Sequence, residues 1–176
     1  MVKNAVTYTT DAGMSNYIWT VEGATVSGGS INSNTVTLIW NATGNKTVTV
    51  QYTGSGGCAT TTGTKTVQVN ALPNPTITGN INVCANQSGV TYTTEGGMKN
   101  YVWIDTGGNI TSGGGNIDNT VTVTWEAAGT GVVSVIYTNM NNCTAATAKE
   151  LAVTSKALPV PTVTGHVSVC STARNA

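Results

Sequence analysis

The stretch Asn-Thr-Val-Thr-Val-Thr-Trp at residues 119–125 decides the fold class, because polar and apolar side chains alternate along it. A period of two puts the two kinds of side chain on opposite faces of a β-strand. The stretch Asn-Thr-Val-Thr-Leu-Ile-Trp at 34–40 has nearly the same pattern. Alternation predicts these inward-facing side chains: Val36, Leu38, Trp40, Val48, Val50, Tyr52 and their counterparts Val121, Val123, Trp125, Val133, Val135 and Tyr137. Likewise, Tyr17 and Trp19, matched by Tyr101 and Trp103, share one face of a strand.

Every other candidate element alternates in the same way, and none shows apolar residues at helical spacing. The predicted class is therefore all-β, with two tandem immunoglobulin-like sandwiches, because short strands separated by Gly, Asn and Ser turns are typical of that fold. The predicted strands are 5–10, 16–21, 24–27, 34–40, 46–53 and 64–70, followed by 76–83, 89–94, 100–105, 109–111, 119–125, 131–138 and 148–155.

The two sandwiches are predicted from an internal repeat. Val-Thr-Tyr-Thr-Thr at 6–10 returns at 90–94, and Gly-Met-Ser-Asn-Tyr-Ile-Trp at 13–19 returns as Gly-Met-Lys-Asn-Tyr-Val-Trp at 97–103. Ala-Leu-Pro at 71–73 returns at 157–159. A repeat of roughly 85 residues has the size of a domain and not of a solenoid unit.

The repeat divides the chain into three parts. Residues 1–72 are predicted to be a sandwich that lacks its first strand, and residues 73–157 a complete one. Residues 158–176 are predicted to be a linker and the first strand of a following repeat. Leu-Pro-x-Pro at 72–75 and 158–161 marks the linkers, since paired prolines stiffen the chain.

The composition excludes several classes of function. Only 8% of the 176 residues are charged, the formal net charge is zero, and the chain has one histidine, His166. Nucleic-acid and anionic-membrane binding both depend on positive charge, so neither partner is predicted. No stretch is apolar enough for membrane insertion. We expect no enzymatic activity, no catalytic, cofactor-binding or metal-ligating residue, and no cofactor, since the acids and bases for such sites are few and scattered.

The four cysteines leave two pairings open. One joins Cys84 to Cys143, so that Cys58 and Cys170 need partners outside the chain; the other joins Cys58 to Cys84 and Cys143 to Cys170. An extended last strand would separate Cys58 from the linker by about 40 Å, which favours Cys84–Cys143. No Cys-x-x-Cys spacing is present, so zinc is not expected.

Taken in order, Val-Cys, Gly-Val-Thr-Tyr, Asn-Tyr-x-Trp, Thr-Val-Thr-x-x-Trp, the cysteine hairpin and Leu-Pro-x-Pro resemble the PKD-like (polycystic-kidney-disease-like), immunoglobulin-like repeats of large secreted surface adhesins of Bacteroidota-type bacteria. The resemblance implies an extracellular or cell-surface location within a longer secreted protein, since no signal peptide follows Met1. The commoner signature Trp-x-Phe-Gly-Asp-Gly is missing after Trp19 and Trp103.

Three functions follow as expectations. The first is a non-enzymatic structural spacer in a repetitive adhesin or filament, whose partners are neighbouring repeats or copies of the same protein. The second is a subunit that assembles head to tail by donating residues 158–176, with Cys170 bonded to Cys58 of the next copy. The third is a carbohydrate-binding module, which requires an exposed row of Trp or Tyr to stack on polysaccharide.

Overall fold

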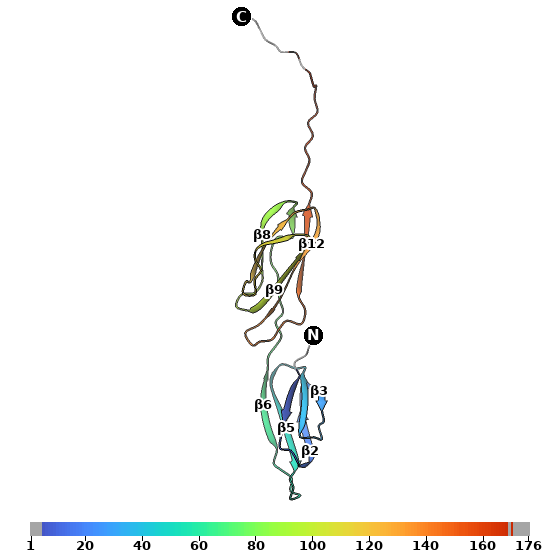
Figure 1. Cartoon of the computed structure of the whole chain (residues 1–176), viewed down its shortest axis with the longest axis vertical. Coiled ribbons are helices and arrows are strands. Elements are labelled where there is room, and N and C mark those ends of the chain that lie inside the picture. Colours follow the sequence, from blue (N-terminus) through green and yellow to red (C-terminus); the bar gives the residue numbers. More distant parts are fainter. Residues whose placement is uncertain (1–4, 169, 171–176) are drawn as a thin grey trace.

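The computed structural model describes residues 5–168 and 170, and within them it contains thirteen β-strands and no helix (Figure 1). The all-β class is therefore confirmed. The strands are β1 (Val6–Thr9), β2 (Ser15–Val21), β3 (Ala24–Gly29), β4 (Thr35–Trp40), β5 (Gly44–Thr53), β6 (Gly63–Val69), β7 (Asn82–Cys84), β8 (Gln87–Thr93), β9 (Lys99–Thr106), β10 (Asn109–Gly113), β11 (Thr120–Trp125), β12 (Gly129–Thr138) and β13 (Lys149–Lys156).

The first sandwich is made of strands β1 to β6. One sheet has the order β1-β4-β3 and the other has the order β2-β5-β6, and all pairs are antiparallel. Its buried core is small and consists of Trp19, Val36, Leu38 and Val48. Tyr8, Trp40, Val50 and Val67 pack against this core but stay partly exposed.

The second sandwich is made of strands β7 to β13. Its sheets have the orders β10-β11-β8 and β7-β13-β12-β9, and β7 runs parallel to β13. The buried core is larger and comprises Ile77, Val83, Val90, Tyr92, Tyr101, Trp103, Val121, Val123, Trp125, Val133, Val135, Tyr137 and Val153.

The alternation predicts the inward faces correctly, but the two sandwiches differ in how deeply they bury them. In the second sandwich Trp125, Val135 and Tyr137 are buried, whereas their counterparts Trp40, Val50 and Tyr52 are only half-buried. The physical cause is the segment 76–84, which covers one side of the second core. The described part of the first sandwich has no strand in the equivalent place.

Segment 76–84 differs from the single strand predicted at 76–83. Its first part forms one bridge to β8, between Thr78 and Thr93, and its last part is β7, which pairs with β13. The chain therefore changes from one sheet to the other between Thr78 and Asn82. Ile77 and Val83 bury their side chains on the two sides of this crossing.

Residues 157–168 follow β13 and form no strand. In Figure 1 this tail leaves the second sandwich at the end opposite to the linker 70–75 and runs away from both sandwiches. Its valines Val160, Val163 and Val167 are fully or almost fully exposed. Part of the strand predicted within 158–176 falls on residues 169 and 171–176, which lie outside the described residues.

Candidate functional site

The first sandwich has an open groove between β1 and β6. It has a volume of about 480 Å³ and is lined on one side by β1 and on the other by the start of β6, with core side chains at its floor. We call it the β1–β6 groove. Its lining residues are Thr7, Tyr8, Thr9, Thr10, Trp19, Val48, Val50, Gly63, Thr64 and Lys65.

In the second sandwich the equivalent place is filled by segment 76–84. The backbones of Thr78 and Thr93 exchange two hydrogen bonds of 2.9 Å, so the segment extends the β8 edge. On the other side, Thr154 N donates to Ile81 O and Ala85 N donates to Lys156 O, both at 2.8 Å. The segment thus closes the sandwich along both edges that the first sandwich leaves open.

A carboxylate holds the start of this segment. Thr76 donates its backbone N–H (3.1 Å) and its hydroxyl (2.5 Å) to Glu95, and Tyr137 donates its hydroxyl to Glu95 Oε2 at 2.8 Å. Burial alone would raise the pKa of Glu95, but the hydrogen bonds from Thr76, Thr94 and its own backbone outweigh it and lower the pKa to about 2. Burial, and then the hydrogen bond to Glu95, raise the pKa of Tyr137.

The first sandwich has a counterpart of this carboxylate in Asp11. Tyr52 donates its hydroxyl to Asp11 Oδ2, as Tyr137 does to Glu95, and this hydrogen bond, followed by burial, raises the pKa of Tyr52. Tyr17 donates its hydroxyl to the Asp11 carbonyl at 2.7 Å. No counterpart of Thr76 contacts Asp11 in the part of the chain that the structure describes. Asp11 is therefore a carboxylate with room for a further donor.

The aromatic side chains are used inside the sandwiches. The Trp19 and Trp103 indoles donate to the backbone carbonyls of Ser33 (2.8 Å) and Asp118 (2.9 Å). Trp40 and Trp125 donate to the hydroxyls of the tyrosines that they meet edge to face, at Tyr8 (3.3 Å) and Tyr92 (3.2 Å). These bonds satisfy the polar atoms of half-buried or buried rings. The described residues present no exposed tryptophan for stacking on a sugar.

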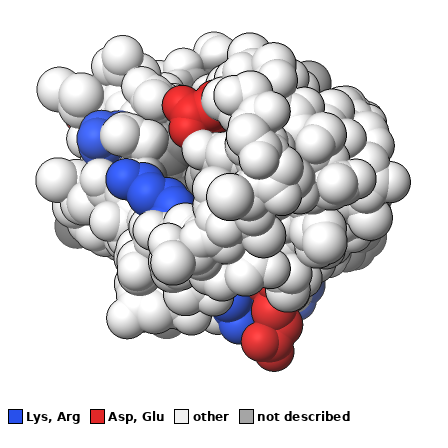
Figure 2. All heavy atoms as spheres, turned by 90° about the horizontal axis from the view of Figure 1, so that it is seen from below, with Lys and Arg blue, Asp and Glu red and all other residues white. Residues whose placement is uncertain are grey.

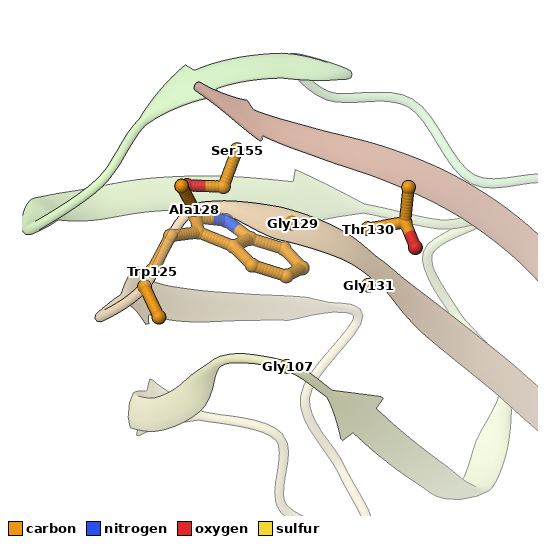
Figure 3. Close-up of a pocket in the computed structure, with 8 residues that line it drawn as sticks. Gly107, Trp125, Ala128, Gly129, Thr130, Gly131 and Ser155 are labelled. Carbon is orange, nitrogen blue, oxygen red and sulfur yellow. The ribbon is translucent and has the colours of Figure 1, made fainter. Parts of the chain in front are cut away.

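A small cavity of about 90 Å³ lies in the second sandwich beside the Trp125 ring. Figure 3 shows Trp125, Ser155 and the glycine-rich stretch from Ala128 to Gly131 around it. The Ser155 hydroxyl is buried and has no hydrogen-bond partner among the described residues. A cavity of this size has room for a few waters at most, and we assign it no ligand.

Charged side chains do not gather into a site. Figure 2 shows a mostly white face on which the few Lys, Arg, Asp and Glu residues form only small groups. Within the described residues no three His, Cys, Asp or Glu side chains are close enough to hold a metal ion. His166 is exposed on the tail. Among the same residues no helix is long and apolar enough to span a bilayer.

The preferred cysteine pairing is wrong for this structure. Cys84 lies opposite Lys156 at one end of β13, and Cys143 lies in the hairpin that precedes Lys149 at the other end. These ends are about 23 Å apart at ~3.3 Å per residue, far beyond the reach of a disulfide. All four cysteines are unpaired in the described residues. The sequence argument considered only the distance of Cys58 from the linker and did not show that the length of the last strand also separates Cys143 from Cys84.

Two sandwiches of paired sheets, with internal aromatic networks and one open groove, define a tandem immunoglobulin-like protein. Residues 70–153, just under half of the chain and nearly all of the second sandwich, match the sequence model of the PKD-like domain family. A similar solved structure is that of the fibronectin(III)-like modules of CbhA from Clostridium thermocellum. It has 17% identity and a TM-score of 0.37, and the alignment covers 93% of this chain and 92% of that one. No curated protein matches the chain.

Asp11 and the groove were not singled out by the sequence analysis. The signal that could have found Asp11 is its place after Val-Thr-Tyr-Thr-Thr, where the second repeat has Glu95. The groove itself depends on which strands pair with segment 76–84, and this long-range pairing is not visible in the repeat.

Proposed function

We propose that the chain is a non-enzymatic structural module, a stiff spacer of tandem sandwiches within an extracellular surface protein. The extracellular location rests on the resemblance to surface-adhesin repeats, and the match of residues 70–153 to the PKD-like family supports the structural role. We propose the same division as from the sequence: 1–72 and 73–157 as the two sandwiches, and 158–176 as the linker and first strand of a following repeat.

The observation that carries this proposal is the path of the chain through the second sandwich. The chain arrives at one end through residues 70–77 and leaves at the opposite end after Lys156 (Figure 1). The arriving segment is hydrogen-bonded side by side and parallel to the departing strand β13. A pull on the two ends therefore shears all the β7–β13 hydrogen bonds together instead of opening them one by one. This arrangement suits a module that transmits force.

The internal use of the aromatic rings favours this role over carbohydrate binding. The tryptophans face the cores and direct their indole N–H groups to protein oxygens. A sugar-stacking platform needs at least one ring with an open face.

Single-molecule stretching of the chain between two handles tests the proposal. We expect the second sandwich to unfold in one step, at a higher force than a variant in which Val83→Ser weakens the docking of β7. The exposed substitution Thr78→Ser is the matched control and should leave the force unchanged. Gradual unfolding of the wild-type second sandwich without a force peak would contradict the role, and so would a saturable tryptophan fluorescence change on titration with polysaccharides.

A further inference from the structure

We propose that the β1–β6 groove of one copy binds the tail of a second copy, residues 161–170, as a donated strand. This proposal goes beyond the spacer role and applies to copies in which no strand of the same chain occupies the groove and no following repeat takes up residues 158–176. It stands on the groove, the tail and the filled groove of the second sandwich. Donation of a strand to an open sheet edge is a recognised mode of protein association.

The first support is that the tail repeats the sequence of the segment that fills the second sandwich. Residues 161–168 read Pro-Thr-Val-Thr-Gly-His-Val-Ser, and residues 75–82 read Pro-Thr-Ile-Thr-Gly-Asn-Ile-Asn. Ile77 is 8% exposed in its place, whereas its counterpart Val163 is 98% exposed on the tail. Docking in the groove would bury an apolar surface that the isolated chain leaves in water.

The second support is that the groove offers the partners that the segment uses in the second sandwich. Thr10 N donates to Asn34 O in the same sheet, so the neighbouring N–H and C=O of Thr9 point to the open edge. These are the counterparts of the Thr93 groups that bond to Thr78. Asp11 stands where Glu95 receives Thr76, and the donated strand carries Thr162 at that position.

The third support is a glycine. A Cβ atom on Gly79 would lie 2.3 Å from Cδ1 of Tyr92, so only glycine can cross that ring. The tail has Gly165 at the same position, where a Cβ atom would meet nothing within 4 Å among the described residues. In the groove Gly165 would cross Tyr8, the counterpart of Tyr92. A docked tail would therefore use Gly165 as the second sandwich uses Gly79.

The geometry requires that the donor is another copy. The tail starts at the end of the second sandwich that is farther from the first sandwich. To reach the groove of its own chain it would have to run back along the length of the second sandwich, and the ten residues of β12 alone span about 33 Å. The five residues 157–161 reach at most about 18 Å. Donation between copies joins two different surfaces, so it repeats from copy to copy and generates chains.

The test measures association of the intact chain by sedimentation velocity over a wide concentration range, in reducing buffer so that thiols cannot cross-link. We expect concentration-dependent, head-to-tail oligomers. Gly165→Leu should weaken association roughly tenfold to a hundredfold, because the new side chain must be accommodated against the Tyr8 ring. Val163→Ser should weaken association as well. Both positions are exposed in the free chain, so neither variant should affect its folding.

The matched control is His166→Leu, which adds the same side chain one residue further along. Its counterpart Asn80 is exposed in the filled groove, so this variant should associate like the wild type. A wild-type chain that stays monomeric at the highest concentration would overturn the proposal. Equal association of Gly165→Leu and His166→Leu would overturn it too, because the contact would then not involve the glycine crossing.

Discussion

Ser155 is a buried hydroxyl without a hydrogen-bond partner in the described structure, beside the small cavity at Trp125. Its counterpart in the first sandwich is Val69. An unpaired buried hydroxyl destabilises a fold by about 1–3 kcal/mol relative to a paired one. A serine at this position therefore destabilises the second sandwich. The valine at the equivalent position of the first sandwich indicates which apolar side chain could replace it.

We predict that Ser155→Val raises the free energy of unfolding of the second sandwich by about 1 kcal/mol, because it removes the unpaired hydroxyl and fills part of the cavity. Chemical denaturation of both proteins provides the measurement. Thr154→Val is the control, since Thr154 is exposed on the opposite face of β13. A destabilised Ser155→Val variant would show that the hydroxyl has a partner, such as bound water.

Glu95 makes the stability of the second sandwich depend on pH. Hydrogen bonds from Thr76 and Thr94 lower its pKa from 4.5 to about 2 in the folded state. A carboxyl group with a lowered pKa stabilises the fold above its unfolded pKa, and this contribution is lost as the pH falls toward the folded value. The stabilisation is therefore complete above about pH 5.5 and declines between pH 4.5 and pH 2.

We predict that Glu95→Gln unfolds more easily than the wild type at pH 7 and that this difference shrinks as the pH falls from 4.5 to 2. Thermal unfolding across that pH range gives the comparison. Glu126→Gln is the control, because Glu126 is exposed. A constant difference between Glu95→Gln and wild type at all pH values would mean that the charge of Glu95 does not matter.

Segment 76–84 is the element that separates a closed sandwich from an open one. It contributes Ile77 and Val83 to the core and caps both sheet edges. The sequence pattern predicted a strand at 76–83, because strand character follows from alternation, but it named none of the inward-facing side chains of this segment. It did not predict the change of sheet after Thr78, since alternation describes one strand and not its partners. Nor did it predict that Trp40 and Val50 are only half-buried, because this depends on the lack of a segment equivalent to 76–84 in the described part of the first sandwich.

At this crossing we predict that Gly79→Ala destabilises the second sandwich by about 1–3 kcal/mol, because the added methyl group collides with the Tyr92 ring. Gly165→Ala is the matched control at the same position of the repeat and should leave the unfolding of the monomeric chain unchanged. Calorimetry of the two variants measures this contrast. Equal effects would imply that the glycine matters for chain flexibility and not for packing.

In the whole molecule, the proposed assembly also suggests how the cysteines pair. The Asn139 side-chain amide contacts both Cys143 N (3.0 Å) and Ala71 O (3.2 Å), so the Cys143 hairpin lies beside the end of the first sandwich. In the second sandwich Cys84 lies opposite Lys156, whose counterpart in the first sandwich is Asn70. A donated Cys170 would therefore lie beside Asn70, at that same end of the first sandwich. Cys58 lies in the hairpin at the opposite end of β6, so the expected Cys170–Cys58 bond does not fit.

We predict that oxidised assemblies contain two disulfides between copies. One joins Cys170 of the donor copy to Cys143 of the acceptor copy. The other has the same geometry one repeat earlier and joins Cys84 of the donor copy to Cys58 of the acceptor copy. Oxidised glutathione serves as the oxidant: each pair of thiols loses two protons and two electrons and forms one S–S bond, while the glutathione disulfide becomes two thiols. Peptide mapping without reduction identifies the pairs. Bonds within one copy, or Cys170–Cys58, would contradict the arrangement.

The central claim is that the β1–β6 groove of the first sandwich binds the tail. Amide hydrogen exchange at Thr9 tests this claim most directly. The Gly165→Leu chain, whose own tail should bind roughly tenfold to a hundredfold more weakly, is mixed with a synthetic peptide of residues 158–176 under reducing conditions. We predict that saturating peptide slows exchange of the Thr9 amide at least about tenfold, since this N–H gains a strand partner as Thr93 N has in Thr78 O. A peptide carrying Gly165→Leu should need a roughly tenfold to hundredfold higher concentration for the same effect. Unchanged exchange at Thr9 with saturating wild-type peptide would contradict the claim.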